Sequence, residues 1–261
     1  MDTSNVSHSL VDSTESVLSL LEIIQTLPTS KPSLFLDLEG VSLSRHGSIS
    51  LITIFVQPQK HVYLVDIHAL HSRAFSTSTG NGTTLKSILE SPTIIKVFFD
   101  VRNDSDALYS HFGVKLRGIE DVQLMENAAR PGARRFLVGL EKCINTHAPL
   151  SPSEKLRWKA AKEVGLELFH PSKGGSYEVF NARPMDAAVE LYCINDVQYL
   201  PQLREVFLPR LNDAWRKKVK DETEKRVVES QSELYEPQGE NKKFGPWPTV
   251  TPASFERAFR W

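Results

Sequence analysis

Apolar runs with the length of strands dominate the first half of the chain. The segments Ser33–Leu38, Ile49–Val56 and His61–Ile67 are rich in β-branched and aromatic residues, and the short turn QPQK separates the last two. A fourth run, Ile94–Phe99, has the same character. The pattern predicts a sheet that begins with an antiparallel meander.

Helical spacing of apolar residues predicts helices around and after these strands. The first has Val17, Leu20, Leu21 and Ile24 on one face and ends at Leu27–Pro28. Another follows the polar sequence VRNDSD, and five more are predicted at Leu85–Leu89, Val122–Ala129, Arg135–Thr146, Glu154–Val164 and Asp186–Leu200. Because strands and helices alternate through the middle of the chain, the predicted fold class is α/β.

Composition divides the 261 residues into three parts. Residues 1–30 are predicted to form a helical extension, residues 31–212 the main domain, and residues 213–261 a charged helix followed by an irregular tail rich in Pro and Gly. The Ser/Thr/Gly-rich stretch Ser72–Thr84 is expected to be a mobile loop. A hydrophobic content of 40% is that of a globular domain with a full core.

Bulk properties limit where the protein acts and what it binds. No apolar run approaches the roughly 20 residues that span a bilayer, and the acidic, Ser-rich start lacks the features of a secretory signal. We therefore expect an intracellular protein, nuclear or cytoplasmic, with no membrane partner. Cys143 and Cys193 have no metal-ligand spacing and are predicted to be free, buried thiols.

Two carboxylates stand at the end of the first predicted strand. Because side chains alternate across a strand, Asp37 and Glu39 point to the same face. Close like charges raise at least one pKa unless a cation neutralises them, and Mg²⁺ prefers oxygen ligands of this kind. The alternative is that the strand ends at Asp37 and that Glu39 is solvated in a turn with Gly40.

A third carboxylate interrupts an apolar stripe on the last strongly predicted helix. Positions 189, 192, 193, 196 and 200 share one face and are occupied by Val, Tyr, Cys, Asp and Leu. The Tyr192 hydroxyl and the Asp196 carboxylate therefore lie on neighbouring turns, where a phenol could orient a water that attacks a phosphate. The alternative is a core tyrosine, with Asp196 hydrogen-bonded to a buried donor.

The segment Phe99–Leu108 supplies further carboxylates in and before the first turn of a helix. Acids are common at such positions because they cap the helix and complement its dipole. Asp106 is therefore the least distinctive of the candidate carboxylates when it is read alone.

In this order, the three groups resemble the exonuclease motifs of the DEDDy group, which includes ribonuclease D and the exonuclease domains of Werner-type helicases and proofreading polymerases. The motifs read LDLEG, NDSDAL and YCINDV, and the resemblance spans about residues 31–205. The phrases RNDSDALY and KGGSYEVF and the pair Arg183–Pro184 are similar to eukaryotic 3′-5′ exonuclease domain-containing proteins. The resemblance implies a ribonuclease H-like fold, a five-stranded mixed sheet with an antiparallel second strand and flanking helices.

The same resemblance implies a function and a role for each motif residue. The expected activity is 3′-to-5′ hydrolysis of single-stranded nucleic acid with a free 3′ end, RNA rather than DNA, releasing nucleoside 5′-monophosphates. Two Mg²⁺ or Mn²⁺ ions would be held by Asp37, Glu39, Asp106 and Asp196, and Tyr192 would position the attacking water. Asp37 would bridge the two ions, whereas Asp106 would hold the second ion through water. Asp104 is the alternative second-motif ligand, although the Asp-x-Leu spacing favours Asp106.

Basic residues between the second and third motifs are the expected contacts to the nucleic-acid backbone. Ten Lys or Arg stand against five Asp or Glu from Arg130 to Arg183, although the net charge of the whole chain is −1. The candidates are Arg134, Arg135, Lys173 and Arg183, and the alternative is an ordinary solvated surface. Two other functions stay open: a weakly active or inactive nucleic-acid-binding scaffold of this fold, and a structural protein whose acids form ordinary salt bridges.

Overall fold

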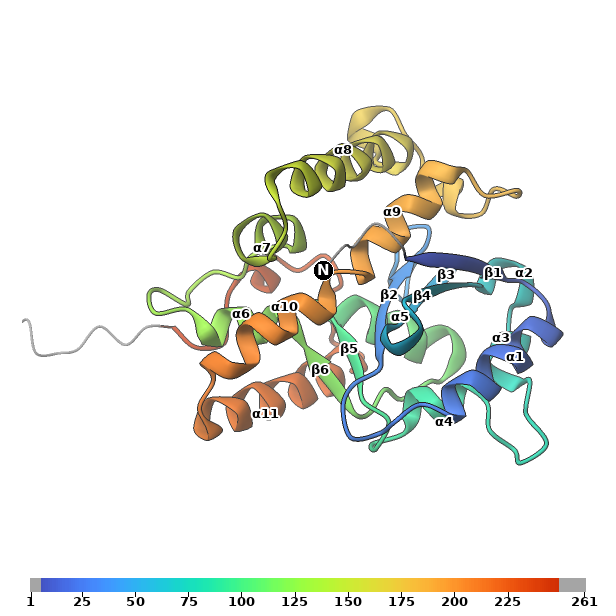
Figure 1. The fold of residues 1–261 in the computed structure, drawn as a ribbon, viewed down its shortest axis with the longest axis horizontal. Coiled ribbons are helices and arrows are strands. Elements are labelled where there is room, and N and C mark those ends of the chain that lie inside the picture. The colour runs from blue at the N-terminus through green and yellow to red at the C-terminus, as the bar shows by residue number, and fades with distance from the viewer. Residues whose placement is uncertain (1–5, 249–261) are drawn as a thin grey trace, which may run out of the picture.

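Residues 6–248 are described by the computed structural model, which has a six-stranded mixed sheet with helices on both faces (Figure 1). Strand β3 is antiparallel to both of its neighbours, whereas the other pairs of adjacent strands are parallel. The strands are β1 (Ser7–Val11), β2 (Leu34–Glu39), β3 (Leu51–Val56), β4 (His61–Asp66), β5 (Lys96–Phe98) and β6 (Ile119–Asp121), in the order β1-β4-β3-β2-β5-β6. The predicted α/β class is confirmed, but the expected number of five strands is wrong.

The sixth strand is β1, which lies in the segment that was expected to be purely helical. Its residues pair in parallel with β4, from Ser7 opposite His61 to Val11 opposite Val65. Val11 is its one fully buried residue, so the strand gives little apolar signal in the sequence. The predicted helix follows directly as α1 (Thr14–Gln25) and buries its apolar face in the core of the domain.

The predicted helices are present in the predicted order, with shifts at their ends, and α2, α3 and α10 are additional to them. The helix predicted at Asp186–Leu200 ends at Val197, and a new helix begins at Leu200, with Pro201 in its first turn, where a missing backbone donor costs nothing. Ser72–Thr84 contains one short helix and an isolated bridge between Ser78 and Thr84. The helices are α2 (Ile67–Leu70), α3 (Arg73–Ser76), α4 (Leu85–Glu90), α5 (Arg102–Phe112), α6 (Val122–Ala129), α7 (Leu140–His147), α8 (Pro152–Phe169), α9 (Ala187–Val197), α10 (Leu200–Phe207) and α11 (Asp213–Ser230).

Alternation along β2 assigns its side chains to two different cores. Leu34 and Leu36 belong to the core that α1, α4 and α5 cover, whereas Phe35 belongs to the core that α6 to α10 cover. Asp37 and Glu39 follow Phe35 at intervals of two and therefore face the side of α9. The sheet thus directs both carboxylates toward the helix that carries the third motif.

The C-terminal part of the described chain packs on the second motif. Helix α11, present where a charged helix was predicted, lies against α5, α6 and β6. Its Arg226 is 4% exposed and donates to the fully buried Asp121 over 2.7 Å. Asp121 also accepts from the backbone N–H of Asp100 and of Val101, at the start of α5. The predicted tail is described only as far as residue 248, and its remainder lies outside the described residues.

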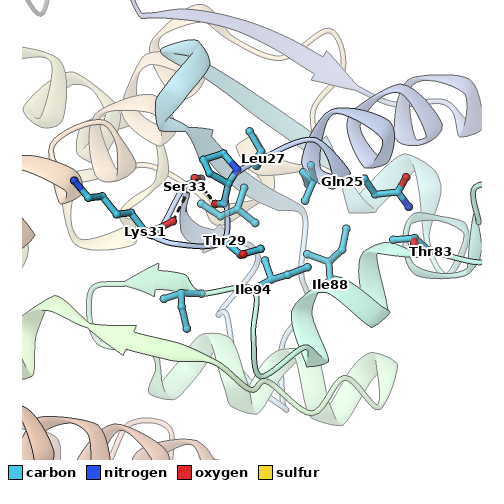
Figure 2. Close-up of a pocket in the computed structure, with 12 residues that line it drawn as sticks. Gln25, Leu27, Thr29, Lys31, Ser33, Thr83, Ile88 and Ile94 are labelled. Carbon is cyan, nitrogen blue, oxygen red and sulfur yellow. Dashed lines mark hydrogen bonds between the residues drawn. The ribbon is translucent and has the colours of Figure 1, made fainter.

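Both cysteines are free and buried, as predicted. Within residues 6–248, no helix combines the length and the apolar character needed to cross a bilayer. A cavity of about 220 Å³ lies beside the start of β2, between the end of α1 and α4, and Ile88, Ile94 and Lys31 are on its wall (Figure 2). No carboxylate is among the described residues that line this cavity, so it is not a candidate metal site.

Candidate active site

Three carboxylates from two motifs meet where β2 ends against α9, near the centre of Figure 1. One oxygen from each of Asp37, Glu39 and Asp196 lies within 4.8 Å of the others. Metal–oxygen distances of about 2.0–2.6 Å separate the ligand oxygens of one ion by up to about 5 Å. The predicted convergence of these three side chains is therefore present, and the group fits a hard divalent cation.

Burial and mutual repulsion make this cluster unstable as a set of bare anions. Burial, followed by the charges of Glu39 and Asp196, raises the pKa of Asp37 well above its ordinary value. Burial and the charge of Asp196 raise the pKa of Glu39 to about 8. The cluster must therefore take up protons or a cation at neutral pH.

Lys162 supplies one such cation, and sequence reasoning did not identify it. The Nζ atom of this α8 residue lies 2.6 Å from both carboxylate oxygens of Asp196, with the side chain only 12% exposed. The same ammonium lies 3.7 Å from the centroid of the Tyr192 ring. Lys162 therefore neutralises the third-motif carboxylate, and a metal ion bound by Asp196 has to compete with it.

Tyr192 is held beside the cluster by the close approach of α8 and α9. A Cβ atom at Gly165 would lie 2.5 Å from the Tyr192 ring, so only glycine fits at this point of α8. Phe169 packs edge-on against the same ring at 4.8 Å. Burial, and then the charge of Asp196, raises the pKa of the Tyr192 phenol, so the hydroxyl keeps its proton at neutral pH. Glycine inside a helix gave no motif in the sequence, but it fixes the position of this tyrosine.

Asp104 lies beside the carboxylate cluster, next to the end of β2. Its Oδ1 atom accepts from the backbone N–H of Leu38, which lies between Asp37 and Glu39. Its charge contributes to the raised pKa of both of those acids. Burial raises the pKa of Asp104 itself to about 7. Asp104 thus adds a fourth buried carboxylate beside Asp37 and Glu39.

Asp106 has a different set of partners from Asp104. Two residues correspond to about 200° around a helix, so Asp104 and Asp106 face opposite sides of α5. The fully buried Asp106 accepts from the Nε atom of Arg45 at 2.6 Å and from its backbone N–H at 2.8 Å. The Arg45 guanidinium also donates to the carbonyl of Ser230, the last residue of α11, and to that of Ser232, just after this helix. Through Arg45, Asp106 thus joins α5 to the end of α11.

The four basic candidates occupy different environments. Arg183 binds both carboxylate oxygens of the buried Asp66, at 2.5 and 2.7 Å, so its guanidinium is engaged at the end of β4. Arg134 donates to the carbonyls of Ala128 and Arg130 and lies over a tryptophan ring. Arg135 and Lys173 are exposed.

Comparison with known proteins gives one family and one fold. A family described as 3′-5′ exonuclease matches residues 11–212. The piRNA biogenesis protein EXD1 of Xenopus laevis is 29% identical over 177 residues, which is 65% of this chain but only 36% of that protein. Trypanosoma brucei RNase D in complex with RNA U12 has a TM-score of 0.70 at 20% identity, covering 98% of this chain and 80% of that one. Escherichia coli RNase D, an exoribonuclease involved in structured RNA processing, has a TM-score of 0.59 at 20% identity, covering 87% and 51%. The expected ribonuclease H-like fold is thereby confirmed.

Proposed function

Because the chain belongs to the 3′-5′ exonuclease family, we propose that it is a metal-dependent exonuclease of the DEDDy type, which removes nucleotides singly from the 3′ end of nucleic acid. The observation that carries the proposal is the convergence of Asp37, Glu39 and Asp196 within 4.8 Å, beside Asp104. Ordinary salt bridges do not account for this group, because Lys162 neutralises only one of its four acids.

The acids divide between two cation sites that share Asp37. Asp37, Glu39 and Asp196 would hold one ion, and Asp37 with Asp104 would hold the other, with Mg²⁺ or Mn²⁺ suited to these oxygen ligands. Two ions bound there would promote deprotonation of a water and offset the charge that develops on the leaving 3′ oxygen. The chain itself positions the ligands, through the β2–α9 contact and through the hydrogen bond from Leu38 to Asp104.

Tyr192 is proposed to orient the water that attacks the scissile phosphodiester. Its hydroxyl remains protonated at neutral pH, so it can both donate and accept a hydrogen bond. Packing against Gly165 and Phe169 limits the rotation of its ring. A fixed phenol of this kind favours one direction of attack, which produces a nucleoside 5′-monophosphate.

Arg134, Arg135 and Lys173 are proposed to contact the phosphates of a single-stranded substrate, and Arg183 is not retained for the reason given above. RNA is favoured over DNA, since the Trypanosoma brucei neighbour was solved with RNA and the Escherichia coli neighbour is an exoribonuclease.

The experiment is degradation of labelled single strands by purified protein. RNA and DNA of one sequence, labelled at the 5′ end or at the 3′ end, are incubated with Mg²⁺, Mn²⁺ or EDTA. We expect immediate release of the 3′ label as a nucleoside 5′-monophosphate, a shortening ladder from the 5′-labelled strand, faster cleavage of RNA, and no reaction in EDTA.

Matched variants connect the activity to the cluster. Asp37→Asn should abolish release, whereas Asp221→Asn, the same exchange on the exposed side of α11, should leave it unchanged. Binding of RNA without cleavage under any metal would contradict the proposal and support the scaffold alternative.

A further inference from the structure

Two exposed phenylalanines from distant parts of the chain form a pair on the surface. Phe136, between α6 and α7, is 51% exposed, and Phe244, in the segment after α11, is 40% exposed. Their ring centroids are 5.4 Å apart, with the planes inclined by 32°. A single exposed aromatic residue is ordinary, but a fixed pair of exposed rings is not.

The backbone holds this pair in place. Phe136 and Phe244 face each other across an isolated antiparallel bridge. The N–H of Leu137 donates to the carbonyl of Lys243 at 2.9 Å, and the N–H of Gly245 donates to the carbonyl of Arg135 at 2.8 Å. The rings are thus presented by paired main chains rather than by two independent loops.

Cations surround the two rings. The Arg135 guanidinium lies 5.2 Å from the centroid of Phe136 and 6.0 Å from that of Phe244. The Lys243 ammonium lies 5.6 Å from the centroid of Phe244 and also pairs with Glu240. Exposed aromatic faces interleaved with Arg and Lys provide stacking surfaces for bases and charges for phosphates. Charge complementarity therefore favours a polyanion with unstacked bases over an apolar protein partner.

The pair lies on a segment that contacts the first turn of α5. Lys242, which precedes Lys243 directly, donates from Nζ to the Oδ1 atom of Asn103 at 2.5 Å, and Arg102 donates to the Lys242 carbonyl at 3.0 Å. Asn103 is the neighbour of Asp104 in the first turn of α5. Phe244 follows Lys242 by only two residues, at the end of a short 3-10 helix (Glu240–Lys243), so the pair stands directly after the contact with the second motif.

We propose that Phe136, Phe244, Arg135 and Lys243, together called the aromatic patch, bind the single-stranded nucleic acid upstream of the nucleotide being removed. The rings stack on bases, and the two cations contact phosphates. The assignment of the patch to the 5′ side of the cleaved bond rests on the proposed function, because only the terminal 3′ nucleotide occupies the carboxylate cluster. The patch would make affinity depend on the length of the strand rather than on its sequence.

The test is binding of 5′-fluorescent oligouridylate to metal-free protein in EDTA, measured by anisotropy. Strands of about 12 nucleotides should lose roughly 5- to 150-fold in affinity for each stacked base when Phe136→Ala and Phe244→Ala are combined. Strands of about three nucleotides should bind the variant and the wild type equally. Phe136→Tyr with Phe244→Tyr keeps two aromatic faces and should bind the longer strand like the wild type.

Control variants separate stacking from local damage. Leu234→Ala removes a 90% exposed apolar side chain from the same C-terminal segment and should change neither affinity. Arg135→Gln with Lys243→Gln should make binding of the long strand less dependent on salt. Wild-type affinity of the alanine double variant for the long strand overturns the proposal, as does equal weakening with both strand lengths.

Hydrolysis of the same strands in Mg²⁺ distinguishes this proposal from the proposed function. Cleavage of the short strand at the wild-type rate by the alanine double variant, with slower cleavage of the long strand at low concentration, is the expected result. If the wild-type protein does not cleave but binds longer strands more tightly, and the alanine double variant loses this dependence on length, the exonuclease function is refuted. The patch would then remain a nucleic-acid interface. Cleavage by both proteins with identical length dependence would refute the patch alone.

Discussion

Asp104 and Asp106 are buried side chains of the same helix, α5. Replacing each of them by asparagine tests whether that side chain serves catalysis or the stability of the fold. Asp104 is proposed to hold the second metal ion, and burial raises its pKa to about 7, so its ionised form is unfavourable in metal-free protein at neutral pH. Asp104→Asn should therefore leave the free energy of unfolding unchanged or raised. Activity should fall at least about 100-fold, since even residues that only support a metal ligand contribute about 10- to 100-fold.

Asp106→Asn should have the opposite effect. The exchange weakens two charge-assisted hydrogen bonds from Arg45, which is 16% exposed against 0% for Asp106. Breaking such a buried pair costs about 3–5 kcal/mol, and the carbonyl partners that Arg45 keeps reduce this to about 2–4 kcal/mol. The melting temperature should fall by roughly 5–15 °C, whereas activity measured well below that temperature should change little.

The two variants are compared by urea unfolding in EDTA and by single-turnover hydrolysis at saturating Mg²⁺. Asp221→Asn on the surface of α11 reports the effect of the exchange itself. Loss of hydrolysis by Asp106→Asn with wild-type unfolding would refute the reasoning and return Asp106 to the role of metal ligand. The same would follow if Asp104→Asn remained fully active.

Three further predictions concern the groups around the cluster. Gly165→Ala places a Cβ 2.5 Å from the Tyr192 ring and should lower the free energy of unfolding by about 1–3 kcal/mol. The same variant should lower kcat more than it changes KM, and Gly132→Ala, where a Cβ meets nothing within 4 Å, is the control. Lys162→Met removes the ammonium that competes with a metal ion for Asp196, and divalent-ion binding measured by calorimetry should tighten about tenfold. This factor corresponds to the loss of one charge-assisted hydrogen bond of about 1.5 kcal/mol, and unchanged or weaker binding would contradict the prediction. In EDTA, the free energy of unfolding should fall as pH rises from about 4 to 8, because the pKa values of Glu39, about 8, and Asp104, about 7, in the folded protein exceed their ordinary values and the folded state is destabilised as these groups ionise. Urea unfolding of Glu39→Gln should show a smaller fall over this pH range, and an equal fall would refute the contribution of Glu39.

The fold was predictable where each element carried its own signal. Strands β2 to β5 have apolar runs bounded by turn residues, and α6 was predicted with both of its ends. Strand β1 escaped because an edge strand with Ser7, His8 and Ser9 has little apolar periodicity, and its existence depends on pairing with β4, more than 50 residues away.

The candidate site was predictable to the extent that it depends on local geometry. Alternation along a strand places Asp37 and Glu39 together, and helical spacing places Asp196 beside Tyr192. The choice between Asp104 and Asp106 requires knowing which side of α5 meets β2, and spacing along the chain does not contain that information. Lys162 was missed for the same reason, since its contact with Asp196 exists only where α8 packs on α9.

The buried ion pair of Arg226 and Asp121 joins a residue inside the part of the chain that matches the exonuclease family to a residue outside it. Asp121 lies within the matched residues 11–212, whereas Arg226 lies beyond them. Replacing either partner alone removes the shorter of the two ion pairs of Arg226, with Asp100 at 3.6 Å as the other, so substitutions at positions 121 and 226 should be inherited together. Relatives that retain an acid at the position of Asp121 are then expected to retain a helix equivalent to α11 with a cation in register, and correlated variation at these two positions would trace the true evolutionary extent of the domain past residue 212.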